Sequence, residues 1–268
     1  MMKGSVKAFP LTAILLAIAV TPLQAQMDTK LELETLEAFQ TYVRSTESVL
    51  QKRDNGEKPF LWINEDPKQR EKARQGNIVV HQFEGDTIAV TGGLVHDWVG
   101  VMFVPGANLE ATEALLKDFD RHKDIYPEVI EAKLIEENGE TIRSMMRTTK
   151  KKVLTVVLEM ELEADYLRLS DKRYVIRSYS TRVSEVKDAG EPKETMLPDG
   201  EGTGFLWRLY SYWRIEQVDD GVFVELETVS LTRDIPFGLG FIIKPFIKNV
   251  PRESLTAMLQ ATRLALTQ

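Results

Sequence analysis

Four charged side chains near the C-terminal end of the chain are the residues best placed to do chemistry. They lie on two neighbouring segments, 205–217 and 222–233, whose alternating pattern predicts the two strands of a hairpin. The four are Arg208, Arg214, Glu225 and Glu227, and Tyr210 and Tyr212 lie between the arginines. Side chains two residues apart on a strand share a face, so we expect all six groups together.

Two interpretations of that charged face remain open. It is either a solvated outer surface, where each cross-strand salt bridge is worth less than about 1 kcal/mol. Or it is the polar floor of a cavity, where a few fixed polar groups orient a ligand head group. The sequence does not decide between them.

The opposite face of the same hairpin is aromatic and apolar. A loop of Asp220-Gly221 would pair Arg214 with Glu227 and bring the apolar sides of both strands together. Trp207 and Trp213 lie on that apolar side. We therefore expect them on the face that forms the core and any cavity.

Metal and thiol chemistry have little support in the sequence. The chain has no cysteine, which excludes disulfides, thiolate zinc sites and cysteine nucleophiles. Its three histidines, His81, His96 and His122, are far apart. We expect no metal site, and we expect His96 to be a core or cavity residue with a hydrogen-bond partner.

Other common sites are also missing. There is no Gly-x-Ser-x-Gly motif, and the glycines at 200, 202 and 204 are not followed by the Lys-Ser/Thr of a phosphate-binding loop. We expect no cofactor. The formal net charge of −7 argues against nucleic-acid binding, which needs a basic face.

The last segment of the chain, Pro251–Leu266, predicts a helix around which the rest is organised. Pro251 suits the first helical position. Apolar or small side chains recur at helical spacing on one side: Leu255, Met258, Leu259 and Thr262. An apolar helix must bury that side against another layer, so we expect a curved sheet to close around it and to enclose a cavity.

The sequence between residues 87 and 233 predicts seven consecutive antiparallel strands, with a helical segment between the first two. Gly100, inside the first strand, indicates a point where another element approaches the backbone closely. Asn138-Gly139 is the strongest hairpin signal and would pair Ile135 with Ile142.

Three parts are expected along the chain. Residues 1–25 predict a cleaved signal peptide, because a basic start precedes a ten-residue apolar run that is well short of the roughly 20 residues that span a bilayer. Residues 26–76 predict a helical extension, either an arm packed on the main domain or a separate cap. Residues 77–268 form the main domain. We expect export to the periplasm or the medium, with no later membrane span.

Several local motifs resemble those of the START-like (Bet v 1-like, SRPBCC) superfamily. The motifs are Trp98–Gly106, Leu116–Asp120, Tyr126-Pro127, Leu231–Pro236 and Asn249–Leu255. The resemblance covers about residues 87–267. It implies an α+β helix-grip fold, in which a seven-stranded antiparallel sheet wraps round a long C-terminal helix. Members bind lipids, sterols, quinones or plant hormones, and some are polyketide cyclases or aromatases.

Three functions stay open at this point. The favoured one is binding of a hydrophobic small molecule between the sheet and the last helix. The second is a cyclase or hydratase that uses Glu225, Glu227 or His96 as acid or base. The third is an envelope interaction protein that docks through a helix at 30–52. Contact with a membrane surface and the oligomeric state are not decided.

The ligand-binding candidates combine both faces of the hairpin with the first strands and the last helix. They are His96, Trp98, Met145, Trp207, Tyr210, Tyr212, Trp213, Arg214, Glu225, Glu227, Leu255, Met258, Leu259 and Thr262.

Overall fold

The computed structural model describes residues 28–85, 87–151, 155–235 and 240–268, with side chains of 240–248 left out. The expected signal peptide lies outside these residues. Within them, no helix has both the length and the apolar character needed to cross a bilayer.

Seven long strands form the body of the molecule, as the sequence predicts. They are β4 (Gly93–Pro105), β5 (Val129–Asn138), β6 (Thr141–Lys151), β7 (Thr155–Ser170), β8 (Arg173–Lys187), β11 (Arg208–Val218) and β12 (Gly221–Arg233). Shorter strands are β1 (Thr29–Lys30), β2 (Val79–Gln82), β3 (Ile88–Val90), β9 (Thr195–Met196) and β10 (Glu201–Gly202).

Five α-helices and three 3-10 turns complete the described chain. The helices are α1 (Leu33–Asp54), α2 (Pro67–Arg74), α3 (Leu109–Lys117), α4 (His122–Ile125) and α5 (Gly240–Leu266). The 3-10 turns are η1 (Trp62–Glu65), η2 (Phe83–Gly85) and η3 (Phe119–Arg121).

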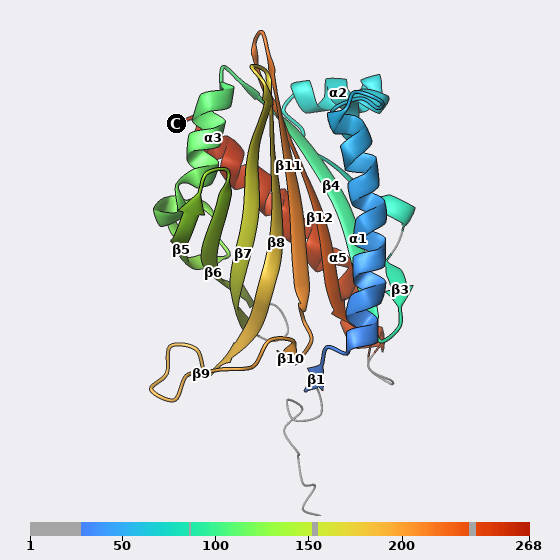
Figure 1. Ribbon diagram of the computed structural model, residues 1–268, viewed down its shortest axis with the longest axis vertical. Helices are drawn as coiled ribbons and strands as arrows, with labels where there is room; N and C mark the ends of the chain where they lie inside the picture. Colours follow the sequence, from blue (N-terminus) through green and yellow to red (C-terminus); the bar gives the residue numbers. More distant parts are fainter. Residues whose placement is uncertain (1–27, 86, 152–154, 236–239) are drawn as a thin grey trace, which may run out of the picture.

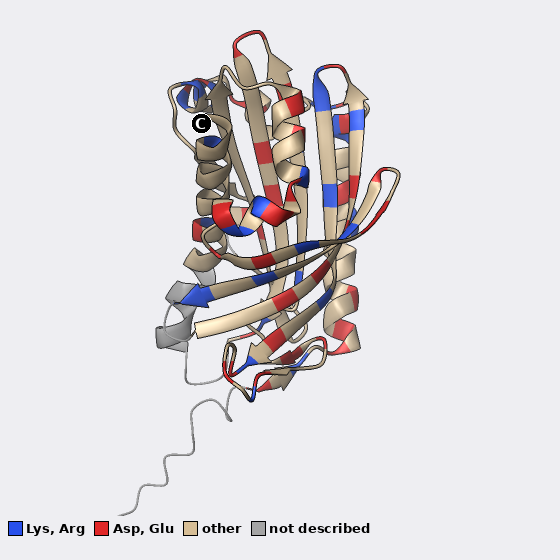
Figure 2. Cartoon of the chain, turned by 90° about the vertical axis from the view of Figure 1, so that its left-hand side faces the viewer, with Lys and Arg blue, Asp and Glu red and all other residues tan. Residues whose placement is uncertain are grey.

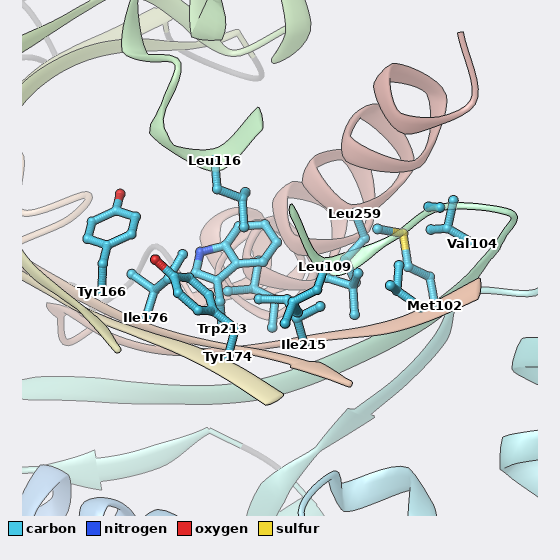
Figure 3. Packing of buried hydrophobic residues seen from close by; sticks show 14 of the residues in the cluster. Met102, Val104, Leu109, Leu116, Tyr166, Tyr174, Ile176, Trp213, Ile215 and Leu259 are labelled. Atoms are coloured by element: carbon cyan, nitrogen blue, oxygen red, sulfur yellow. The ribbon is translucent and has the colours of Figure 1, made fainter. Parts of the chain in front are cut away.

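The sheet is antiparallel and strongly bent. Its strand order is β2-β4-β12-β11-β8-β7-β6-β5, and its concave face curves around α5 (Figures 1 and 2). The main core cluster lies between that face and α5, with α3 closing one side (Figure 3). This is the helix-grip arrangement expected from the sequence, and we call the concave side the grip face.

Gly100 confirms the expected close approach. A Cβ atom built there would lie 2.6 Å from Leu259 Cδ1 and 3.3 Å from Leu255 Cδ2. The glycine therefore leaves room for these leucine side chains, and a Cβ atom there would force Leu259 to move.

The start of the last helix was predicted wrongly. α5 begins at Gly240 and runs for 27 residues, so Pro251 lies inside the helix rather than at its first position. The fixed φ of proline is compatible with a helix, and only the missing hydrogen bond and a clash with the preceding turn disfavour it. An interior proline therefore produces the same local pattern as a first-turn proline.

Both hairpin registers differ from the predicted ones. Asn138 pairs with Thr141, so the loop is Gly139-Glu140 and Ile142 pairs with Glu137. An irregularity between Leu134 and Glu136 also leaves Ile135 out of the ladder. Arg214 pairs with Glu225, not with Glu227. That second shift is by two residues, which keeps the side chains of the paired residues 208–218 and 221–231 on their predicted faces.

The N-terminal extension packs against the convex face of the sheet, opposite α5 (Figure 1). Phe39, Val43 and Leu50 of α1 are buried there, at the helical spacing that the sequence shows. The segment after α1 covers the rest of this face with Phe60, Leu61 and other residues. The apolar stripe of α1 is thus already occupied within the chain, so it is not free to serve as the predicted docking element.

Candidate functional site

The structure divides the predicted site residues between the two faces of the sheet. On the grip face it brings together the tryptophans of β4 and β11 and the inner residues of α5, as expected. These are Trp98, Trp213, Leu255, Met258 and Leu259, all in or packed against the main core cluster. Thr262 is fully buried one turn further along α5.

His96 also lies on the grip side of β4. It is two residues from Trp98, and its Nε2 lies 3.0 Å from Oγ1 of Thr232 on β12. The side chain is buried, which agrees with a core or cavity histidine that has a hydrogen-bond partner.

Five other candidates lie on the convex face of the sheet and therefore do not line the grip. Tyr210, Tyr212, Arg214, Glu225 and Glu227 point to the convex side, beneath α1 and the segment that follows it. That face is neither solvated nor part of the grip, so both interpretations drawn from the sequence were wrong. The reason is that periodicity shows which residues share a face but does not show which layer covers it.

Trp207 and Met145 are also absent from the grip. Trp207 precedes the regular part of β11 and packs in the cluster with Phe39 and Val43. Met145 pairs with Glu161 on the outward side of β6, next to a network of arginines and glutamates on neighbouring strands. Both basic and acidic residues are visible along these strands (Figure 2).

Among the described residues of the grip, Trp98 carries a polar group that its surroundings leave unsatisfied. Its side chain is 9% exposed and lies among the apolar residues of the main cluster. Its Nε1 is fully buried and has no hydrogen-bond partner among the described residues. A buried donor without an acceptor is destabilising by about 1–3 kcal/mol and calls for an explanation.

Hydrogen bonds and one charged contact fasten α5 to its surroundings. Tyr126 Oη lies 3.2 Å from Thr262 Oγ1, and burial raises the pKa of Tyr126, so the phenol stays neutral. Lys150 of β6 donates to Ser254 Oγ at 2.9 Å and pairs with Glu128. The sequence offered no signal for this contact, because its three residues come from three distant segments.

The convex face carries a buried polar stripe under α1. Arg214 Nη2 donates to Asp54 Oδ1 at 2.6 Å, and its Nε donates to the Phe60 carbonyl at 2.8 Å. Its side chain is 2% exposed and also stacks on the Phe60 ring. Arg177 pairs with the same Asp54.

The acidic groups of this stripe are less well compensated. Glu225 accepts a hydrogen bond from the Trp62 backbone N–H at 2.7 Å, while its other oxygen has no partner among the described residues. Burial raises the pKa of Glu225 to about 7, although Arg214 and Arg53 oppose the rise. Burial also raises the pKa of Glu227 well above its usual value, and the neighbouring Asp97 adds to the rise.

Asp97 and Asp54 are the residues that sequence reasoning missed at this stripe. Asp97 lies inside the mostly apolar sequence of β4, and this could have indicated a buried polar site, since a buried acid needs partners. Asp54 was assigned to a helix-breaking turn. Its pairing with Arg177 and Arg214 depends on α1 lying across two strands, which the local sequence does not reveal.

The described residues hold no group of three histidine, aspartate or glutamate side chains arranged to bind a metal ion. An open groove of about 420 Å³ lies at the far end of the molecule, between α2, the end of β4 and the end of α5. It is lined by Arg74, Phe103, Arg263 and Leu264, among others, and it is separate from the grip cluster.

Comparison with known proteins gives fold similarity only. No family model and no curated protein matches the chain. A STAR-related lipid transfer protein fragment from Xanthomonas axonopodis is 15% identical, with a TM-score of 0.47, covering 71% of this chain and 99% of that one.

Two further structures give similar values. Human STARD10 is 13% identical (TM-score 0.43, covering 74% of this chain and 79% of that one). The Zhui aromatase/cyclase of Streptomyces sp. R1128 is 13% identical (TM-score 0.42, 64% and 93%). Similarity at this level is a likeness of fold and says nothing about ligand or reaction.

Proposed function

We propose that the protein binds a hydrophobic small molecule between the grip face of the sheet and α5. The observation that carries this proposal is the Trp98 N–H, which is buried in an apolar cluster and finds no acceptor within the described part of the chain. A bound molecule that presents a hydrogen-bond acceptor to Nε1 would satisfy it. Small-molecule sites commonly combine an apolar lining with a few polar groups of this kind.

The surroundings of Trp98 indicate the class of ligand. Trp213, Leu255 and Leu259 offer apolar contact, and the tyrosine and threonine hydroxyls near α5 are already bonded to each other. A mainly hydrocarbon molecule with an oxygen acceptor fits this lining, as a lipid, quinone or sterol-like compound would.

The direct test is extraction from the natural source. Protein purified from its own host, without detergent, should show an additional mass in native mass spectrometry. Organic extraction should release that species for identification. Protein that is free of any extractable molecule would contradict the proposal.

Two tryptophans make a matched pair for the second test. Trp98 and Trp207 both have a buried Nε1 with no partner among the residues that the structure describes, but of the two only Trp98 lies in the grip. We expect Trp98→Phe to weaken binding of the probe 8-anilinonaphthalene-1-sulfonate, or of the extracted species, several-fold. Trp207→Phe should leave binding unchanged. Equal effects of the two substitutions would contradict the role given to Trp98.

The alternative of a cyclase or hydratase loses two of its three candidate groups. Glu225 and Glu227 have raised pKa values, but they lie on the face away from the grip. His96 remains a prediction for an acid or base on the grip side.

We further propose that the protein is exported, because residues 1–25 have the pattern of a signal peptide. N-terminal sequencing of the mature protein from its host, together with cell fractionation, tests this. A cytosolic protein that retains residue 1 would contradict it.

A further inference from the structure

Two buried carboxyl groups lie next to each other beneath α1. Asp97 on β4 is 2% exposed and Glu227 on β12 is 5% exposed. Asp97 is opposite Val229 and Glu227 is opposite Val99, so the two acids are diagonal neighbours on the convex face. Neither forms an ion pair in the part of the chain that the structure describes.

The titratable and charged groups that act on this pair come from α1, η2 and the neighbouring strands. From α1, Tyr42 Oη donates to Asp97 Oδ2 at 2.8 Å, and Thr46 faces the same carboxyl. From η2, Glu84 adds a negative charge near Asp97. On the side of Glu227 the charged neighbours are Glu225, Arg53 and Arg214, and the Tyr212 phenol is also close.

The two arginines are held by other partners. Arg214 donates to Asp54 and to the Phe60 carbonyl. Arg53 donates to the Pro59 carbonyl and pairs with Glu65. They therefore reduce the repulsion between the acids but do not neutralise either of them directly.

Ionising both of two adjacent carboxyl groups in this buried position costs a large free energy. Burial disfavours each charge, and each charge disfavours the other. Burial is accordingly the largest cause that raises the pKa of Asp97 and of Glu227.

We propose that α1 is a pH-dependent cover of the convex face, which stays closed while Asp97 and Glu227 keep a proton and loosens when the pair loses it to solvent. When α1 loosens, water can solvate the second carboxylate that forms as the pair loses its proton. The ends of α1 remain held, since β1 pairs with β10 and Asp54 pairs with Arg177 and Arg214. The middle of the helix, around Tyr42, is the part that opens.

Hydrogen exchange measured on the full chain tests this cover. Protection of residues 36–46, corrected for intrinsic exchange rates, should fall by about tenfold or more between about pH 6 and about pH 9. A pKa that differs by about one unit between the closed and the open state changes the opening equilibrium by that factor. Protection of residues 255–266 in α5 should stay constant. The double variant Asp97→Asn/Glu227→Gln should keep residues 36–46 protected at both pH values.

A carboxyl on the same helix provides the matched control. Glu47 accepts hydrogen bonds from Tyr179 and Tyr212, and Glu47→Gln should keep the pH-dependent loss. If the double variant does not fold, the single variant Glu227→Gln takes its place. The proposal is wrong if wild-type α1 shows no pH dependence, if α1 and α5 lose protection together, or if the amide variants lose protection like the wild type.

Discussion

At the scale of single residues, contact between Gly100 and α5 determines how tightly the sheet grips its helix. Leu259 is fully buried, and its Cδ1 occupies the space that a Cβ on residue 100 would need. The two positions therefore act as a pair, in which the small residue on the strand makes room for the large one on the helix.

This pairing predicts a non-additive result. Leu259→Ala should reduce the free energy of unfolding by about 2–5 kcal/mol, as for other buried leucines. Gly100→Ala should reduce it by about 1–3 kcal/mol, because the added methyl group overpacks the contact. The double variant should be more stable than the sum of the two losses implies.

Urea denaturation of the four proteins completes this cycle. A strictly additive double variant would show that α5 does not press on Gly100. A much smaller loss for Leu259→Ala, together with altered retention of a bound molecule, would show instead that Leu259 lines a hollow.

At the scale of secondary-structure elements, the N-terminal extension acts as a third layer. α1 and the segment at 60–74 bury the convex face that a two-layer grip would leave in water. Arg214 holds this layer through Asp54 and the Phe60 carbonyl. The resemblance to START-like proteins did not include this segment, so the covering role could not be read from it.

Removal of the extension provides a prediction at this scale. Deleting residues 26–76 should expose Tyr212, Val229 and Leu231, which are buried under α1. We expect a shortened protein that aggregates or unfolds at a lower temperature, because large apolar patches promote association. Thermal unfolding with light scattering measures this, and an equally stable and monomeric product would show that the extension is dispensable.

At the scale of the whole molecule, buried acids make stability depend on pH. The pKa of Glu225 is raised from 4.5 to about 7 in the folded protein. As pH rises, the unfolded chain loses this proton first, and the folded chain must later ionise a fully buried group. The stabilisation that the protonated Glu225 carboxyl gives to the folded state is therefore complete below about pH 4.5 and is lost as the pH rises through about 7.

Glu225→Gln tests the sign of this effect. The wild type should lose stability on the order of 3 kcal/mol from this group between these pH values, and the variant should lose less, since glutamine can still accept the Trp62 N–H. Urea titrations at several pH values measure the difference, with the exposed Glu191→Gln as control. An unchanged slope in the Glu225 variant would contradict the prediction.

A carboxyl that is held by two arginines acts in the opposite direction. Hydrogen bonds from Arg147 and Arg182 lower the pKa of Glu159 despite the opposing effect of desolvation. Its contribution is present above its unfolded pKa and is lost as the pH falls. The two kinds of acid together should give a stability maximum on the acid side of neutrality.

The sequence by itself determined the seven long strands, the shared faces within their regular parts and the inner side of α5. These follow from periodicity, which is local: Leu255 and Leu259 repeat at helical spacing, and Trp213 and Ile215 alternate along a strand. The exact registers were beyond it, because a shift of two residues in the β11–β12 hairpin preserves every face.

Only the tertiary structure decided what covers the two faces. The stripe with Arg214, Glu225 and Glu227 is polar in the sequence whether water, a ligand or another helix lies above it. Its burial depends on Asp54 and Tyr42 arriving from more than 50 residues away along the chain. Such long-range pairing is fixed by the packing of whole layers, which no local pattern in the sequence records.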